Sequence, residues 1–297
     1  RCLANVYYNK NMYDDFYQNA EGLYEDVMAG KWTWDRLREI SATVWNDLDS
    51  DGVPSWDDRL GFGINDYNNI DALFYGTGTR VTTRDKNNLP VLSLNTERTA
   101  NVVKKLYQFC FDTPGGFMYG PEYTDDVKNR QKFEDGESMF LFGFFYTAEA
   151  MREMTDDYGI LPVPKYDESQ QNYITFGNAY VPAYIALPAN NNRGSMNGVI
   201  LDSMGFISQR DVQPLVASVT LKGKAARDEG SHKMIDIIYE DIYLDLNCCY
   251  DLGGSFTLLR DITMGKLENF SSKWEAKKKK ATSDFEKLLE QFLAIEE

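Results

Sequence analysis

The sequence has few of the residues that most catalytic and metal centres need. Its 297 residues include one histidine, His232, and four cysteines without the spacing of a zinc site or a Cys-x-x-Cys redox pair. No apolar run approaches the roughly 18 residues that would indicate a membrane-spanning helix. The net charge of −15 excludes nucleic acid and anionic membrane surfaces as expected partners, because both attract basic proteins. Nucleotide-binding loops and the GxSxG and HExxH motifs are absent.

What is present is typical of an α/β protein with a large core. Hydrophobic residues make up 43% of the chain, and helical periods alternate with short apolar runs. Thr33 is a good N-cap for a helix that reaches about Trp45. We expect strands over residues 61–64 and 180–187, loops over 65–71 and 111–121, and helices starting near Asn95 or Thr96, at Ser231 and near Ser271. An apolar stripe runs along the last helix, through Trp274, Ala281, Phe285, Leu288 and Phe292.

The most informative segment spans residues 133–164. Its apolar run Met139–Leu141 predicts a buried strand, and Gly143 then precedes three adjacent aromatic residues, Phe144, Phe145 and Tyr146. Ligands of α/β proteins bind outside the carboxyl ends of the strands, and flat aromatic rings suit the C–H face of a sugar. The alternative is that the triplet belongs to the core, since strand alternation would bury one or two of the rings.

The order of several motifs resembles the extracellular solute-binding proteins of bacterial ABC sugar importers, the family related to maltose-binding protein. Gly136, Glu137 and Met139 match its turn and strand, and Phe145 stands where the family usually has a tryptophan. Further matches are Val6–Lys10, Trp32–Trp34, the Asp-rich loop from Asp47, and Lys224–Asp228 before Ser231. The resemblance implies a two-lobed α/β fold of periplasmic-binding-protein type II, with one lobe near complete and the other partial.

The resemblance also implies a binding function without catalysis. The protein would capture a carbohydrate, most simply an oligosaccharide, and deliver it to ABC permease subunits. Three groups of residues are expected to contact the ligand. They are the aromatic triplet, the polar segment after the strand expected over residues 61–64, and two residues near the second hinge crossing. In the same order, the residues are Phe144, Phe145 and Tyr146, then Asp66, Tyr67 and Asn68, then Asn178 and Tyr180. For residues 66–68 an ordinary polar turn is the alternative.

The expected domain organisation follows the same family. Residues 1–8 would form the first hinge crossing and 9–164 the first part of the main lobe. Residues 165–210 would hold the second hinge and a remnant of the other lobe, and 211–297 the rest of the main lobe. Because the chain starts at Arg1 without an export signal, we expect an N-terminally truncated chain. Its setting would be bacterial and extracellular, in the periplasm or on the cell surface, with membrane attachment through a lipid anchor that this chain lacks.

The acidic segment 47–58 has the spacing of a calcium loop. Its ligands would be Asp47, Asp49, Asp51, the Val53 carbonyl, Ser55 and Asp58, with Gly52 at the sharp turn. Asp in place of Glu at the last position and a strand after the loop depart from the helix–loop–helix pattern. We therefore expect a structural Ca²⁺, with a solvated acidic turn as the alternative.

Two other functions remain open from the sequence. A carbohydrate-active enzyme would need paired carboxylates about 5 to 10 Å apart, which no motif here provides. A surface interaction module stiffened by the calcium loop is the second alternative.

Overall fold

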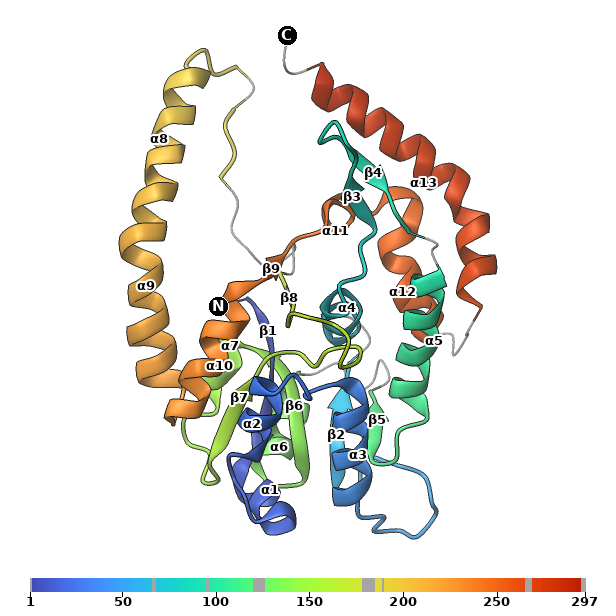
Figure 1. The fold of residues 1–297 in the computed structure, drawn as a ribbon, viewed down its shortest axis with the longest axis vertical. Helices are drawn as coiled ribbons and strands as arrows, with labels where there is room; N and C mark the ends of the chain where they lie inside the picture. Colours follow the sequence, from blue (N-terminus) through green and yellow to red (C-terminus); the bar gives the residue numbers. More distant parts are fainter. Residues whose placement is uncertain are drawn as a thin grey trace.

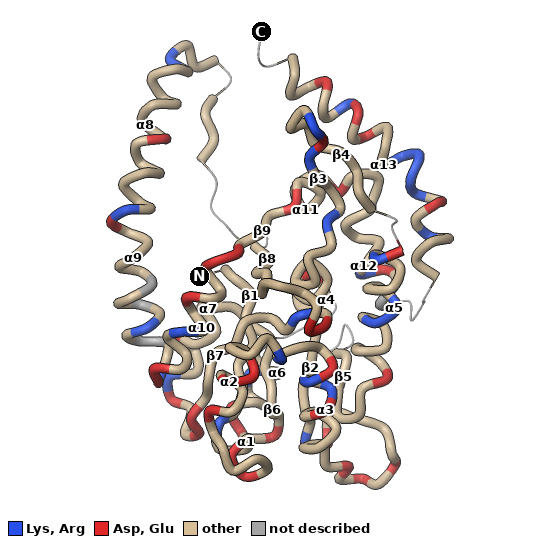
Figure 2. Tube along the Cα trace, viewed as in Figure 1, with Lys and Arg blue, Asp and Glu red and all other residues tan. Residues whose placement is uncertain are grey.

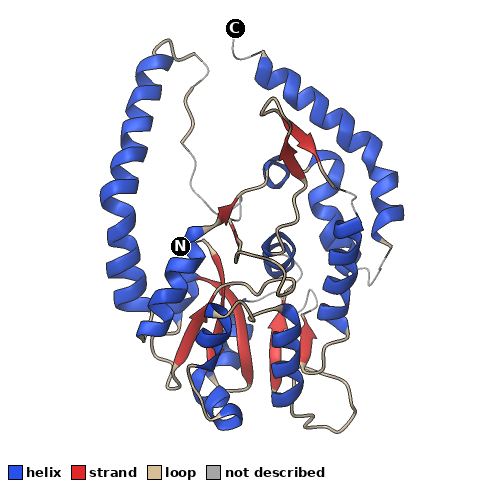
Figure 3. Cartoon of the chain, in the orientation of Figure 1, coloured by secondary structure: helices blue, strands red, loops and turns tan. Residues whose placement is uncertain are grey.

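The fold is described from a computed structural model over residues 2–65, 68–94, 97–119, 126–177, 185–188, 190–264 and 269–294. Its centre is a five-stranded sheet in the order β5-β2-β6-β1-β7 (Figures 1 and 3). The strands are β1 (Ala4–Asn9), β2 (Leu60–Ile64), β5 (Gly116–Met118), β6 (Ser138–Phe144) and β7 (Tyr158–Leu161). Strands β2, β5, β6 and β7 run in one direction, and β1 runs against its neighbours β6 and β7.

Helices cover this sheet on both faces, so β1, β2 and β7 are buried along their whole lengths. Helix α3 (Trp34–Val44) confirms the expectation from Thr33, whose hydroxyl accepts a hydrogen bond from the Arg36 N–H. The other helices around the sheet are α1 (Lys10–Tyr17), α2 (Gly22–Met28), α6 (Asp126–Glu134), α7 (Phe145–Ala150) and α10 (Glu229–Glu240).

A second group of elements lies beyond the carboxyl edge of β2 and β6 (Figure 1). It contains α4 (Asn68–Gly76), the hairpin β3 (Thr82–Arg84) and β4 (Pro90–Leu92), α11 (Leu246–Tyr250), α12 (Ser255–Met264) and α13 (Phe270–Leu293). Helix α5 (Glu97–Phe111) connects this group to the sheet, since its Phe109 ring stacks on Phe62 of β2 with 4.8 Å between the centroids. The strands β8 (Thr175–Phe176) and β9 (Ile242–Tyr243) form a short parallel pair between the two groups. Trp274, Ala281 and Phe285 of α13 are buried, as the stripe predicted, whereas Phe292 is exposed.

A long helical arm extends away from both groups at its α8 end (Figure 1), whereas its last turns pack against α7 and α10, where Leu221 is buried. It begins with α8 (Gly194–Ile207), continues through wider turns and α9 (Gln213–Leu215), and ends at Ala225. Among the described residues, no helix has the length and apolar character needed to cross a membrane.

Several local expectations were wrong. The expected loop 65–71 gives way to α4 at Asn68, the loop 111–121 contains β5, and helix α8 was not expected. Helix α8 could not be predicted from the sequence, because it contains glycines and its apolar residues do not lie on one side, which is the pattern that helix prediction depends on. Ile185–Pro188 are not in a strand, and the rest of that expected strand lies outside the described residues. The division into hinge crossings and lobes stays a prediction.

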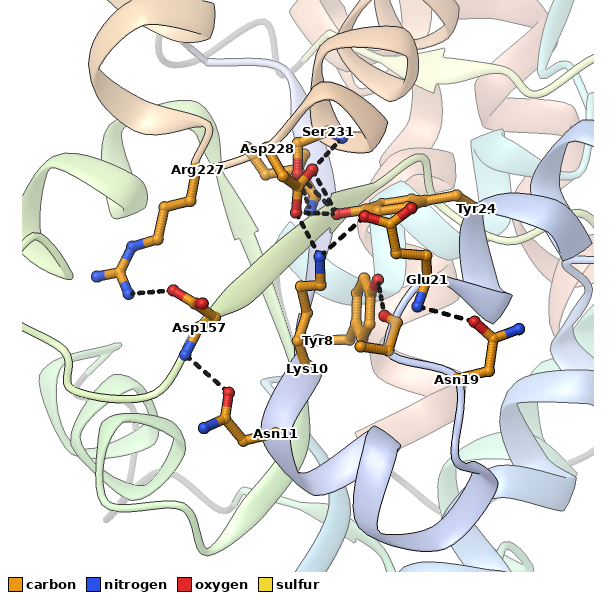
Figure 4. Close-up of polar contacts among 12 residues, drawn as sticks. Tyr8, Lys10, Asn11, Asn19, Glu21, Tyr24, Asp157, Arg227, Asp228 and Ser231 are labelled. Atoms are coloured by element: carbon orange, nitrogen blue, oxygen red, sulfur yellow. Dashed lines mark hydrogen bonds and ion pairs between the residues drawn. The ribbon is translucent and has the colours of Figure 1, made fainter.

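A polar network fixes α10 against the sheet (Figure 4). Asp228, not Ser231 as expected, is the N-cap: its carboxylate accepts the Ser231 N–H at 2.6 Å. The same carboxylate accepts the Tyr24 hydroxyl at 3.0 Å and pairs with the Lys10 ammonium at 2.7 Å. Ser231 instead accepts the Ile160 N–H through its hydroxyl, at 3.1 Å. The network therefore joins α1, α2, β7 and α10.

Candidate functional site

Strands β2 and β6 are parallel neighbours, so their carboxyl ends meet at one edge of the sheet. Asn65 follows β2 there, and the aromatic triplet lies at the junction of β6 and α7. A small cavity of about 60 Å³ opens at this edge. Its polar and aromatic lining comes from β6, α7, α6 and the start of α4: Asn65, Asn69, Asn129, Arg130, Phe144, Tyr146 and Thr147.

The three aromatic residues have different surroundings. Tyr146 is 41% exposed, and its ring stacks on Phe144 with 5.5 Å between the ring centroids. Phe144 is 6% exposed and lines the cavity. Phe145, the ring expected to meet the ligand, is fully buried and stacks on Tyr239 of α10 at 5.8 Å. Its expected role is corrected on that ground, because a ring enclosed between α7 and α10 has no face left for a ligand.

Glycine is required immediately before this triplet. A Cβ on Gly143 would lie 2.9 Å from the Thr147 hydroxyl oxygen, closer than real side chains allow. That hydroxyl also accepts the Phe144 N–H at 3.2 Å. The close approach lets α7 start directly at the end of β6, which turns Tyr146 toward the cavity while Phe145 enters the core.

The polar side chains that line the cavity are mostly amides, and they already form hydrogen bonds with nearby protein groups. Asn69 accepts the Asn65 N–H at 2.9 Å, and Asn129 accepts the Tyr119 hydroxyl at 2.6 Å. The buried Nε of Arg130 has no hydrogen-bond acceptor and lies 3.4 Å from a Glu134 carboxylate oxygen. A volume of about 60 Å³ suits one or two hydroxyl-sized groups, so a sugar could insert a substituent here but not a whole ring.

The remaining expected ligand contacts are divided between described and undescribed parts of the chain. Asn68 lies in the first turn of α4 and is half-buried. Asp66, Tyr67, Asn178 and Tyr180 lie outside the described residues. Their roles therefore stay predictions from the sequence.

A buried ion pair beside α4 was not anticipated. Asp71 is fully buried, and its carboxylate pairs with the Arg260 guanidinium of α12, whose Nε lies 3.2 Å away. Burial raises the pKa of Asp71 to about 6, although Arg260 acts in the opposite direction. The partners are 189 positions apart, so no local pattern in the sequence could have identified them. The pair joins α4 to α12 within the second group of elements.

The acidic loop brings together part of the expected calcium ligand set. One carboxylate oxygen each from Asp47, Asp49 and Asp58 lie within 4.8 Å of one another. Gly52 has φ +76°, as the expected sharp turn requires. Burial opposes ionisation of Asp58, but the N–H groups of Leu48 and Ser55 outweigh it and lower the pKa of this carboxyl.

The other expected ligands lie outside that group of three. Asp51 accepts the Val53 N–H at 2.7 Å, and the Ser55 hydroxyl accepts the Asp57 N–H at 3.2 Å. At the base of the loop, Asn46 and Arg59 bridge in antiparallel fashion, so the loop ties the end of α3 to the start of β2. The acidic residues of the loop that follows α3 lie at the opposite end of the molecule from α8 and the C-terminal end of α13 (Figure 2).

The chain matches no protein family model and no curated protein. Its fold resembles that of solved binding proteins. The maltose/maltodextrin-binding domain MalE from Bdellovibrio bacteriovorus, bound to maltotriose, has 11% identity and a TM-score of 0.55 over 99% of this chain and 71% of that one. The maltose-binding periplasmic protein MalE from Listeria monocytogenes, in complex with maltose, has 15% identity and a TM-score of 0.57 over 97% and 71%.

A third structure, the ABC substrate-binding protein Lmo0181 from Listeria monocytogenes in complex with cycloalternan, has 10% identity and a TM-score of 0.55, over 96% of this chain and 69% of that one. At these identities the likeness concerns the fold. The α/β fold of this chain therefore resembles that of these binding proteins over about 70% of their length.

Proposed function

We propose that the protein is a solute-binding receptor that captures a carbohydrate, most simply an oligosaccharide, for uptake by an ABC importer. The observation that carries this proposal is the fold, which is shared with binding proteins solved with maltotriose, maltose and cycloalternan. The receptor would act outside the cytoplasm of a bacterium, in the periplasm or lipid-anchored at the cell surface, with permease subunits as its protein partners.

The carboxyl edge of β2 and β6 supports a carbohydrate as the ligand. The exposed ring of Tyr146, backed by Phe144, offers a flat apolar face, and the cavity beside it offers amide and hydroxyl groups. Sugars need both kinds of contact, because their C–H faces stack on rings and their hydroxyls exchange hydrogen bonds. Asp66 and Tyr67, which follow Asn65 in the sequence, and Asn178 and Tyr180 complete the proposed contact set.

Closure between lobes would couple binding to delivery. A ligand that contacts both lobes only when they are closed shifts the population toward the closed state by its differential affinity. Hinge closure of periplasmic binding proteins is a general example of such motion.

The test combines binding with shape and chemistry. The intact protein is titrated calorimetrically with maltose, maltotriose, cycloalternan and a wider glycan panel, and its radius of gyration is measured by X-ray scattering with a saturating ligand. We expect binding by at least one glycan, contraction, and recovery of the glycan unchanged. Binding without contraction would refute the closure mechanism. Chemical conversion of the glycan would refute a receptor function and favour a carbohydrate-active enzyme.

We also propose that the loop 47–58 binds a structural Ca²⁺. Three carboxylates that converge within 4.8 Å repel one another, and a divalent cation removes that repulsion. The remaining oxygens would come from Asp51, the Val53 carbonyl and Ser55, which lie on the same loop. Because the loop ties α3 to β2, its cation would stabilise the fold and take no part in sugar binding.

A further inference from the structure

Three side chains that line the cavity at the carboxyl edge of β2 and β6 already use an acceptor oxygen for protein groups. Asn69 is 5% exposed, and its side-chain oxygen accepts the Asn65 N–H at 2.9 Å. The Asn129 side-chain oxygen accepts a tyrosine hydroxyl at 2.6 Å. The Thr147 hydroxyl oxygen accepts the N–H of the last residue of β6 at 3.2 Å. The capacity for hydrogen bonds that these residues keep for a ligand is therefore mainly that of donors.

The donors of the same lining are largely without partners. Within the described part of the chain, the Asn69 amide nitrogen and the Thr147 hydroxyl hydrogen have no acceptor, and the Asn129 amide nitrogen has only a 3.4 Å contact with a β2 carbonyl. Arg130 adds a guanidinium group, whose buried Nε forms no hydrogen bond. Its one ion-pair contact among the described residues is the 3.4 Å distance from Nε to a Glu134 carboxylate oxygen.

A surface of donors suits a group that accepts hydrogen bonds and donates none. A sugar hydroxyl needs an acceptor as well as a donor, whereas a carboxylate has two oxygens that only accept. The guanidinium of arginine binds a carboxylate through two parallel, charge-assisted hydrogen bonds, which are about twice as strong as neutral ones. Arg130 is the only charged residue in the described lining, and the cavity volume of about 60 Å³ admits a group of this size.

We propose that the glycan recognised by this protein carries a carboxylate, as a uronic acid does, and that Arg130 binds this carboxylate in the cavity. The sugar ring stacks on Tyr146, which is exposed beside the cavity, while Asn69 and Thr147 donate to the carboxylate oxygens. Arg130 is then the residue that distinguishes acidic from neutral glycans. This inference rests on the proposed carbohydrate-binding function and names its class of ligand.

The acidic character of the protein does not oppose a carboxylate at this position. The net charge of −15 repels anions at long range, but salt screens that repulsion beyond about 8–10 Å at physiological ionic strength. Glu134 contacts Arg130 through Nε, so the two Nη nitrogens, which have no described acceptor, remain for the ligand. Asp66 of the proposed contact set would meet hydroxyl groups of the same glycan, since a protein carboxylate accepts their hydrogens.

Calorimetry with matched glycan pairs tests the proposal. The intact protein is titrated with oligomers of glucuronate, galacturonate and mannuronate, and with the carboxyl-reduced counterpart of each, which is neutral. We expect at least one acidic oligomer to bind, and its neutral counterpart to bind at least ~10-fold more weakly, because hydrogen bonds to charged groups are the stronger ones. Added salt should reduce this ratio, since the Arg130 side chain is only partly buried.

The outcomes separate this inference from the receptor function. Neutral counterparts that bind as tightly as the acidic oligomers, or binding by neutral glycans alone, would overturn the carboxylate assignment and leave carbohydrate binding in place. A sulfated oligomer that binds more tightly than every carboxylated one would also overturn it. Absence of binding by any acidic or neutral glycan would refute the receptor function itself.

Two glutamine variants separate local recognition from the overall charge. Arg130→Gln and Lys128→Gln each remove one positive charge from α6, but Lys128 is exposed and does not line the cavity. We expect Arg130→Gln to weaken binding of the acidic oligomer by at least ~10-fold and to leave its neutral counterpart nearly unchanged. Lys128→Gln should leave both nearly unchanged. Equal effects of the two variants would overturn the role of Arg130.

A third variant tests the geometry of recognition. Arg130→Lys keeps the charge and loses the planar pair of donors, so we expect a smaller loss than in Arg130→Gln. A loss as large as that of Arg130→Gln would contradict a contribution from the charge. Urea unfolding of each variant shows whether the fold is intact, and the wild-type ratio between acidic and neutral oligomers tests the proposal without any variant.

Discussion

The Asp228 network gives the sharpest quantitative prediction. In Asp228→Ala, helix α10 loses its N-cap, which contributes about 1 kcal/mol. Lys10, whose side chain is 12% exposed, loses its 2.7 Å carboxylate partner, and hydrogen bonds to charged groups contribute about 1.5–3 kcal/mol. The Tyr24 hydroxyl keeps its 2.9 Å contact with Ser231. We therefore expect the free energy of unfolding to fall by about 2.5–4 kcal/mol.

Two further variants separate the contribution of the helix cap to stability from the contribution of the buried charge. Asp228→Asn retains an oxygen that can cap α10 and loses the charge, so we expect a smaller loss of about 1–2 kcal/mol. Asp35→Ala is the control: like Asp228, Asp35 lies at the start of a helix and pairs with a lysine, Lys105, at 2.7 Å, but its side chain is 63% exposed. Exposed pairs contribute at most about 1 kcal/mol.

The assay is urea unfolding at several pH values, followed by circular dichroism. Burial alone would raise the pKa of Asp228, but the Lys10 ammonium, the Ser231 N–H and the Tyr24 hydroxyl outweigh it and lower the pKa. A lowered carboxyl pKa stabilises the folded state above the unfolded value near 4, and this contribution is lost as pH falls through the folded pKa. The difference between wild type and Asp228→Asn should therefore shrink from pH 7 to pH 3. An Asp228→Ala loss no larger than that of Asp35→Ala would refute the reasoning.

Three further predictions concern the site, the loop and the buried ion pair. Tyr146→Ala should weaken the binding of any glycan that the protein binds by about 10-fold with little change in stability, whereas Phe145→Ala should lower the free energy of unfolding by about 3–5 kcal/mol. Calorimetry measures the first effect and urea unfolding the second. The reverse pattern would contradict the burial of Phe145. Excess chelator should lower the melting temperature of the wild type but not of an Asp47→Asn, Asp58→Asn variant, and an unchanged wild-type value would refute the calcium proposal. Asp71 has its pKa raised to about 6, so its protonated form stabilises the fold below about pH 4 and that stabilisation is lost as pH rises through 6. Urea unfolding should show a fall of about 3 kcal/mol across this range that Asp71→Asn lacks, and parallel profiles would contradict it.

The elements that sequence patterns predicted are those that local physics fixes. Thr33 caps α3 because its hydroxyl reaches an N–H three residues away, and Gly52 marks a turn whose φ is positive. The apolar run 139–141 is a buried strand, and the stripe of α13 faces inward over its first half. Each of these features depends on residues within one or two turns, so the sequence contained the necessary information.

The exposure of each ring in the aromatic triplet depends on residues that are distant in the sequence. Phe145 is enclosed because α10 brings Tyr239 onto its ring from 94 positions away, while Tyr146 next to it faces the cavity. Asp71 lies in helix α4, which was expected to begin as a loop because the residues before it are polar, and the Arg260 guanidinium from α12 neutralises its carboxylate. The sequence by itself therefore determined the cap of α3, the turn at Gly52 and the buried strand at 139–141, whereas the tertiary structure decided which rings of the aromatic triplet meet solvent and which partner neutralises Asp71. The reason is that burial depends on elements distant in the chain, and no local period records their approach.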